Sequence, residues 1–277
     1  AAHAIVVEDT IHYLWARREA GSRWYMMHSH APVSDPTDVT DDPRNPVLSP
    51  TQDGFDNRSV EYPYPFYNPA DGKYYAYYLG RGKTSPKQTG LLVQTGDFGR
   101  WKRVQETPVI PVTEPHEQHS SSHPSVAIDG DTIHILYTGR QGNTWPGKVT
   151  VCHATAPTSN PADVTKDPAN PIFTGSGEEW DSGGVREAEI FKGPEYFHIT
   201  YGGFDGDAWL IGHVRTKDFR TFEANPHNPI FVPSEDPDAW DSDGLLTPQV
   251  FRAGGRWYML YAGLKDGAWQ SGLAVAR

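Results

Sequence analysis

Hydrophobic and polar positions alternate along five short stretches of the chain that resemble one another. Each stretch begins with turn-forming residues and continues with an aromatic-rich alternation of period two, which is typical of a β-strand with two different faces. The copies recur about every 60 residues, and repetition at such a period indicates an array of similar sheets. The copies are DTIHYLWAR (9–17), GKYYAYYLG (72–80), DTIHILYTG (131–139), EYFHITYGG (195–203) and GRWYMLYAG (255–263).

Further strands flank each aromatic strand. One follows it, as in KVTVCHATAP (148–157), and one precedes it, as in HPSVAI (123–128); four copies then run on to a short apolar edge such as NPIFTG. Three internal strands and an edge strand, repeated five times, predict an all-β fold: a five-bladed β-propeller with antiparallel four-stranded blades around a central channel. No segment has the pattern of an amphipathic helix of three turns, so we expect residues 1–277 to form a single domain.

The two ends of the chain leave the last predicted blade without an edge strand. The sequence begins at the innermost strand of the first repeat, HAIVV, and stops after the third strand of the fifth, SGLAVAR. Propellers commonly close by letting one terminus supply the missing strand. We therefore expect either a three-stranded fifth blade or a chain shortened at its N-terminus, and we favour the second.

Composition and charge narrow the function classes. Hydrophobic residues make up 37% of the 277 residues, and no run approaches a membrane span, so we expect a soluble protein and no membrane partner. The net charge of −11 argues against a nucleic-acid partner. A single cysteine, Cys152, excludes an internal disulfide framework and a cysteine-based metal cluster. The compartment (cytoplasmic, or secreted or periplasmic after processing) and the oligomeric state stay open.

The segments that lead into the innermost strands face the predicted channel, where a ligand is expected. Three of them align without gaps and a fourth is related: FDNRSVEYPYPF (55–66), WDSGGVREAEIF (180–191), WDSDGLLTPQVF (240–251) and HEQHSSSHPSVA (116–127). This register puts four different residues at one equivalent position: Tyr62, His123, Glu187 and Thr247. Since one blade suffices to supply a catalytic group, the differences between blades point to the site.

Glu187 is the best candidate for a general acid, because it is the carboxylic acid at this position. The alternative is a surface glutamate, or one ion-paired with Arg186. Glu61 is the second distinctive carboxylate. Glu189 lies two residues after Glu187, so strand alternation predicts the same side, deeper in the channel.

The remaining candidates have competing structural interpretations. Asp56, Asp181 and Asp241 recur between repeats, which favours turn capping over catalysis, although Asp56 is kept as a fallback catalytic residue. Histidine spacing matches no zinc motif, so no metal site is expected. His123 is counted with the catalytic candidates. The expected substrate-binding residues are Glu189, Arg186, Tyr62, Thr247, His3, Trp180 and Trp240, the two tryptophans being either core residues or sugar-stacking platforms.

These motifs resemble those of the five-bladed propeller glycosidases, glycoside hydrolase family 43 and its relatives, families 32, 62, 68, 117 and 130. The resemblance rests on GDFGRW and TPVI (96–110), KDFRTF and NPIF (217–231) and DGLLTPQVFRAGGRWYMLYAG (243–263). It implies an Asp base or nucleophile on the first inner strand, a second Asp on or near the third blade, and a Glu acid on the fourth. The acid carries over to Glu187, whereas the third-blade position holds His123 and the first falls on Ala1.

The resemblance implies a glycosidase that cleaves plant or algal oligo- or polysaccharides, with an exo-acting furanosidase or pentosidase as the guess by analogy. Inversion is expected, with Glu187 as acid and a second carboxylate activating water. No cofactor is implied, and a bound calcium ion is left open. Two alternatives remain: a phosphorylase of the family 130 type, with Arg186, Arg58 and Lys87 holding phosphate, or a propeller that binds sugar without cleaving it.

Overall fold

A computed structural model describes residues 2–19, 23–142 and 148–276. Within these residues the regular structure is β-strand, apart from the short 3-10 helices η1 (Pro115–Glu117) and η2 (Glu179–Asp181). The predicted all-β class is therefore confirmed. Consecutive strands pair antiparallel within each of the groups that follow one another along the chain.

The strands fall into successive groups that correspond to the repeats. The first two are β1 (Ala2–Val7), β2 (Thr10–Glu19), β3 (Arg23–Pro32) and β4 (Thr40–Asp41), then β5 (Ser59–Asn68), β6 (Lys73–Arg81), β7 (Lys87–Gln94) and β8 (Trp101–Arg103). The next two are β9 (Ser120–Asp129), β10 (Thr132–Gln141), β11 (Lys148–Pro157) and β12 (Thr165–Lys166), then β13 (Gly184–Lys192), β14 (Phe197–Phe204), β15 (Trp209–Thr216) and β16 (Glu223–Ala224). The last is β17 (Gly244–Ala253), β18 (Arg256–Lys265) and β19 (Ala268–Val275).

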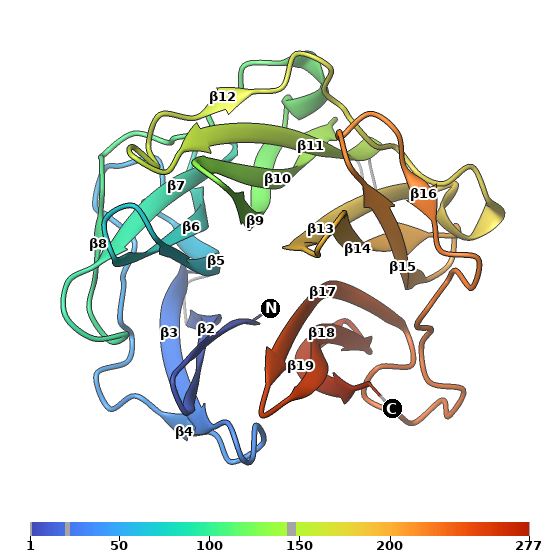
Figure 1. Cartoon of the computed structure of the whole chain (residues 1–277), viewed down its shortest axis with the longest axis horizontal. Coiled ribbons are helices and arrows are strands. Elements are labelled where there is room, and N and C mark those ends of the chain that lie inside the picture. The colour runs from blue at the N-terminus through green and yellow to red at the C-terminus, as the bar shows by residue number, and fades with distance from the viewer. Residues whose placement is uncertain (1, 20–22, 143–147, 277) are drawn as a thin grey trace.

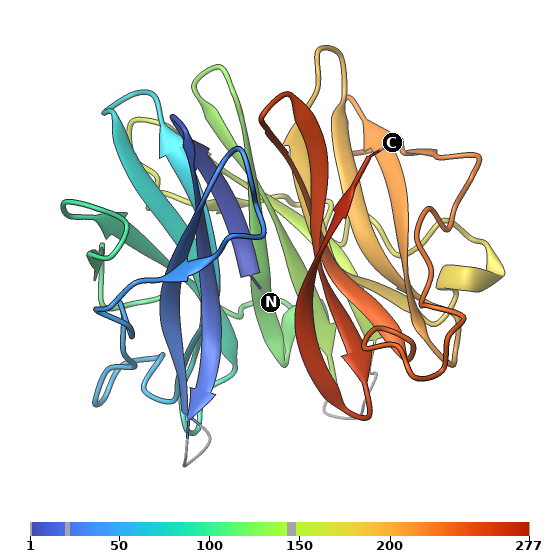
Figure 2. The ribbon, with the colours of Figure 1, turned by 90° about the horizontal axis from the view of Figure 1, so that it is seen from below.

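The groups surround a common centre, as Figure 1 shows from above and Figure 2 from the side. The first strand of each group is innermost, and each contacts the first strand of the next group: β1 with β5, β5 with β9, β9 with β13, β13 with β17, and β17 with β1. The inner strands thus form a closed ring of contacts. Residues on these strands meet at the centre although they lie far apart in sequence.

The predicted edge strand is present in a reduced form. The segment NPVL pairs with β3 through the single bridge Met26–Leu48, and the equivalent segments pair likewise with β7, β11 and β15. The short strands β4, β8, β12 and β16 lie outermost instead. The last group has three strands, which is one of the two alternatives expected for the fifth repeat, because among the described residues no segment pairs with the outer side of β19.

The hydrophobic core is divided among the spaces between neighbouring groups. One cluster joins Tyr77 of the second group to Ile135 of the third, and another joins Leu136 of the third to Tyr201 of the fourth. These side chains are at most 1% exposed. Because both faces of most sheets are covered by a neighbouring sheet, the aromatic residues that the repeat places on alternate positions are buried on both sides.

An aromatic–acid pair before several inner strands fixes the segment that leads into a group against the sheet of that group. The ring of Trp180 packs against Gly203 and Gly212, where a Cβ atom would overlap the indole. The following residue, Asp181, accepts a hydrogen bond from the Tyr201 hydroxyl at 2.9 Å. The same arrangement recurs at Phe55–Asp56 with Tyr78, at Trp240–Asp241 with Tyr261, and at His116–Glu117 with Tyr137. The contacts support the structural interpretation of the recurring aspartates.

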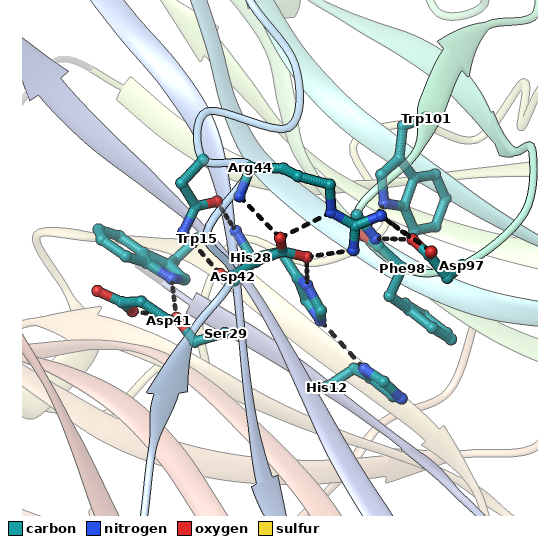
Figure 3. A network of polar contacts seen from close by, with 12 residues as sticks. His12, Trp15, His28, Ser29, Asp41, Asp42, Arg44, Asp97, Phe98 and Trp101 are labelled. Atoms are coloured by element: carbon teal, nitrogen blue, oxygen red, sulfur yellow. Dashed lines mark hydrogen bonds and ion pairs between the residues drawn. The ribbon is translucent and has the colours of Figure 1, made fainter.

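A histidine pair links the first group to the second (Figure 3). The Nδ1 atom of His12 lies 3.0 Å from Nε2 of His28, and Nδ1 of His28 lies 2.9 Å from Asp42. Phe98 of the second group stacks on His12 with ring centroids 4.0 Å apart. Arg44 extends the network, because its guanidinium donates hydrogen bonds to Asp42 and to Asp97, the residue before Phe98. The third and fourth groups repeat this link with His134, His153, Asp167, Phe219 and Arg220.

Candidate active site

Four inner-strand residues share an unusual backbone conformation. Tyr62, His123, Glu187 and Thr247 have positive φ angles between 48° and 56°. Each lies where its inner strand carries one residue more than its partner strand, which is a β-bulge. The equivalence that the sequence alignment predicts for these four positions is therefore confirmed.

Positive φ at a residue other than glycine costs about 1–3 kcal/mol, and such residues cluster at functional sites because a bulge can re-aim a side chain. Here the same bulge occurs on four neighbouring strands at the same end of the ring. The first group's equivalent position, Ala1, lies outside the described residues. The bulges mark one end of the central axis as the candidate site.

A cavity of about 240 Å³ opens at this end. Two carboxylates line it, Glu61 and Glu187, which are 7% and 1% exposed. Tyr62 and Arg186 also line it, together with residues that sequence reasoning missed: Trp24, Trp269, Ala16, Leu246 and Ala262. Pairs of carboxylates beside aromatic rings are the groups that glycoside cleavage requires.

Glu187 is held in place by contacts from two directions. Its backbone N–H donates to Oγ1 of Thr138 at 2.9 Å, which ties the bulge to the neighbouring group. Its carboxylate forms an ion pair with the guanidinium of Arg186, the residue before it. The ion-paired alternative considered for Glu187 is thus what the structure contains, but the pair lies inside the cavity, with side chains 1% and 11% exposed.

Arg186 is itself an unusual cation. Burial lowers its pKa, Tyr62 acts in the opposite direction, and the nearby charge of Arg140 lowers it again, so that the pKa is about 10. The guanidinium also lies over the ring of Trp209, 5.4 Å from the centroid. Arg186 therefore stays cationic at neutral pH and lines the cavity beside Glu187.

His123 lies against both carboxylate-bearing strands. Its Nε2 atom is 3.4 Å from Oε1 of Glu187, and its Nδ1 atom is 2.9 Å from the hydroxyl of Ser122. The ring of Tyr62 meets it edge-on with centroids 4.1 Å apart. Burial, followed by the charges of Arg186 and Lys87, lowers the pKa of His123 well below its usual value. His123 is therefore a neutral imidazole here.

A second layer of polar residues lies two positions further along the inner strands. Nε2 of His3 is 3.0 Å from Oε1 of Glu189, and both residues are almost fully buried. Gln249 forms two hydrogen bonds with the backbone of Ala4: its Oε1 atom accepts from the N–H, and its Nε2 atom donates to the carbonyl oxygen. Burial raises the pKa of Glu189, with His3 acting in the opposite direction. These contacts join inner strands, and neither His3 nor Glu189, both expected to bind substrate, lines the cavity.

Other predicted site residues lie elsewhere. Asp56 bonds Tyr78 and the outer-strand residue Arg103, and it does not line the cavity. Trp180 and Trp240 pack against paired glycines and do not line the cavity. Thr247 takes the fourth bulge position, with its hydroxyl buried and without a hydrogen-bond partner among the described residues.

The tryptophans at the cavity are Trp24 and Trp269 instead. Both stand near the beginning of the third strand of their group, in RWYMM and AWQSG, and Trp209 takes a similar place in the fourth group. That recurrence is a usable sequence signal. The repeat pattern alone places strand three away from the axis, whereas its first residues reach the same end as the bulges.

The described residues were searched for a metal site and for a membrane-spanning helix. Residues 2–19, 23–142 and 148–276 contain no group of three or more His, Cys, Asp or Glu side chains placed to hold a metal ion. In the same part of the chain, no helix is long and apolar enough to cross a membrane.

By fold, the chain is similar to solved structures of glycoside hydrolases. A thermostable family-43 glycoside hydrolase is 14% identical over 99% of this chain and 88% of that one, with a TM-score of 0.77. Another similar structure comes from work on the GH130 family of mannoside phosphorylases, which contains glycoside hydrolases that target β-1,2-mannosidic linkages in Candida mannan. It is 14% identical over 100% of this chain and 85% of that one, with a TM-score of 0.77. A complex of BT0996 with RGII is 15% identical, covers 100% and 86%, and has a TM-score of 0.78.

No protein-family model matches the chain, and no curated protein matches it in sequence. At identities of 14–15% the likeness shows a shared fold. The resemblance to the propeller glycosidases that the sequence motifs indicated is thus confirmed at the level of fold, while activity has to be argued from the site.

Proposed function

We propose that the protein is a glycoside hydrolase whose active site is the cavity between Glu61 and Glu187. The observation that carries this proposal is the presence of two buried carboxylates and two tryptophans around one cavity of about 240 Å³. In this proposal the groups of strands are the five blades of a single propeller domain. The volume of about 240 Å³ favours a single terminal sugar, such as a furanoside or pentoside at the end of a plant or algal oligosaccharide.

In the proposed reaction Glu187 is the general acid and Glu61 is the base. Glu187 donates its proton to the glycosidic oxygen as the bond to the anomeric carbon breaks, and Glu61 takes a proton from the water that attacks the opposite face. This gives inversion and requires carboxyl groups roughly 6.5–9.5 Å apart in the sugar complex. Proton exchange with solvent restores both groups.

Glu187 has to carry a proton before it can act, whereas an ion pair with Arg186 favours the ionised carboxylate. We propose that Arg186 turns from Glu187 to the substrate when the sugar binds. Neutral His123, 3.4 Å from the carboxylate, then remains as a neighbour that adds no positive charge and so does not oppose protonation of Glu187. The tryptophans Trp24 and Trp269 provide apolar faces for the sugar ring.

The test is Glu187→Gln assayed on a panel of aryl glycosides, with Glu195→Gln as the control, since Glu195 is 73% exposed in the same group. Glu187→Gln should lose at least a thousandfold in kcat/KM, less so on substrates whose leaving group needs no proton, and Glu195→Gln should match the parent. Assays with and without phosphate separate hydrolysis from phosphorolysis by the product, free sugar or sugar phosphate. Near-normal activity of Glu187→Gln rules out the acid role. If the parent protein binds the glycosides tightly without cleaving them, it is a sugar-binding propeller instead.

A further inference from the structure

A larger cavity of about 680 Å³ lies at the junction between the first and last groups of strands. We call it the junction groove. Its walls come from β2 and β3 on one side and from β19 on the other, and these two groups face each other in Figure 1. Ala16, Trp24 and Trp269 line both the junction groove and the cavity between Glu61 and Glu187. The two cavities therefore adjoin at these residues.

The side chains and strands at this junction leave space between the two sheets. The core where the last group meets the first contains several alanines: Ala2, Ala4, Ala31 and Ala253. The core between the second and third groups is instead rich in tyrosine and phenylalanine. Among the described residues, the outer side of β19 also has no strand paired with it. Small side chains and an unpaired strand edge leave room that larger groups would fill.

Trp15 forms a fixed aromatic wall of the junction groove. Its indole N–H donates to Oγ of Ser29 at 2.8 Å, and Ser29 donates in turn to Oδ1 of Asp41 at 2.7 Å (Figure 3). Since these contacts satisfy the indole N–H within the protein, the part of Trp15 left for a ligand is its apolar ring. A ring that is held in place before binding loses little conformational freedom when a ligand stacks on it.

The lining of the junction groove combines aromatic rings with short polar side chains. The tryptophans are accompanied by Ser29, Thr37, Gln270 and Ser271. Aromatic rings offer apolar faces for the C–H groups of a sugar, and hydroxyl and amide groups can bond its hydroxyls. Among the described residues that line the groove, Asp41 is the one charged side chain. Because the lining offers a carboxylate and no cation, it favours a neutral carbohydrate over an acidic one.

We propose that the junction groove binds the rest of a neutral oligosaccharide whose terminal sugar occupies the smaller cavity. The substrate is then an extended, uncharged glycan. Its path runs past Trp24 and Trp269, which line both cavities, and on to Trp15, which lines the groove alone. The groove, at about 680 Å³, has more than twice the volume of the cavity of about 240 Å³, so it has room for more than one further sugar. The inference rests on the proposed function for the position of the terminal sugar.

The experiment compares the binding of disaccharides and hexasaccharides to Glu187→Gln by calorimetric titration, so that turnover does not consume the ligand. The probes are xylo-, arabino- and manno-oligosaccharides, with oligogalacturonates as the acidic series. We expect a neutral hexasaccharide to bind about tenfold more tightly than its disaccharide. The acidic series should show no such gain, because the groove presents Asp41 to it. Equal affinities of disaccharide and hexasaccharide in every neutral series would overturn the proposal.

Trp15→Ala in the Glu187→Gln background tests the wall directly. It should remove the gain with length, so that the hexasaccharide binds about tenfold more weakly than before. Trp257→Ala is the control, since Trp257 is 46% exposed on β18 and lines neither cavity. If Trp15→Ala does not fold, Ser271→Trp fills the groove from an exposed position on β19 and should have the same effect. A gain with length that survives in the folded variant would refute the groove.

The turnover of the parent protein separates this inference from the proposed function. Binding that strengthens with length, without hydrolysis of any series, would refute the proposed function alone. Hydrolysis with the same kcat/KM for short and long neutral substrates would refute the groove alone. Sedimentation of the parent as a dimer that Ser271→Trp dissociates would show that a second copy of the chain fills the groove, and this result would also overturn the proposal.

Discussion

The histidine pair of Figure 3 makes the stability of the protein depend on pH, and His12→Gln tests this dependence. Burial lowers the pKa of His12 from 6.5 to about 4, helped by the neighbouring His28 and His30 and opposed by Asp97. The folded state therefore binds a proton more weakly than the unfolded state. It follows that the contribution of His12 to stability is fully present above pH 6.5 and is lost as the pH falls from 6.5 towards 4.

The size of the effect follows from the two pKa values. At about pH 5 the imidazole of the unfolded chain is almost fully protonated, while in the folded protein it is mostly neutral. Linkage then gives a loss of about 2 kcal/mol in the free energy of unfolding between about pH 7.5 and pH 5 for this one residue. This is a large part of the roughly 5–15 kcal/mol that typically separates a folded protein from its unfolded state.

The assay is urea unfolding at both pH values, followed by tryptophan fluorescence. His12→Gln removes the contact to His28 and the stack on Phe98, so it should cost about 1 kcal/mol at pH 7.5. Its further loss on acidification should be about 2 kcal/mol smaller than that of the parent. The exposed His227 provides the control His227→Gln, which should follow the parent. An equal pH dependence in His12→Gln and the parent would refute the reasoning.

Two other predictions concern packing and the site. Tyr201→Phe removes a hydrogen bond from the buried Asp181 and should lower the free energy of unfolding by about 1–3 kcal/mol. Urea unfolding measures this loss, with Tyr67→Phe at an exposed position as the control. Equal stability of the two variants would show that the bond contributes nothing. Trp269→Ala should raise KM about tenfold, equivalent to about 1.4 kcal/mol, with the fold retained. Trp257→Ala, similarly exposed at 46% on the adjacent strand, should not change KM, and an equal effect of both would dismiss the stacking role.

The repeat was the part of the fold that could be predicted from sequence. Period-two alternation and turn residues depend on neighbours in the chain, so the aromatic strands such as 131–139 were expected where β10 and its equivalents lie. The ungapped alignment also placed Tyr62, His123, Glu187 and Thr247 in register, because one local bulge is repeated in each copy.

What the sequence could not provide is contact between residues from different repeats. The position of Glu187 near His123 depends on how β9 and β13 meet at the centre. The same holds for Trp24 and Trp269, which are about 245 positions apart in the chain but line one cavity because the ring of strands closes between its last and first groups.

Sequence alone therefore determined the all-β class, the repeat and the glutamates worth testing, since these follow from local alternation and from residue chemistry. Only the tertiary structure decided that the recurring Asp–Tyr and Trp–Gly contacts fix each entry segment to its own sheet, and that Lys87, Arg140 and Arg186 line one small cavity. The physical reason is that burial and charge proximity are properties of the closed ring. They arise when strands from separate repeats exclude water from a common centre.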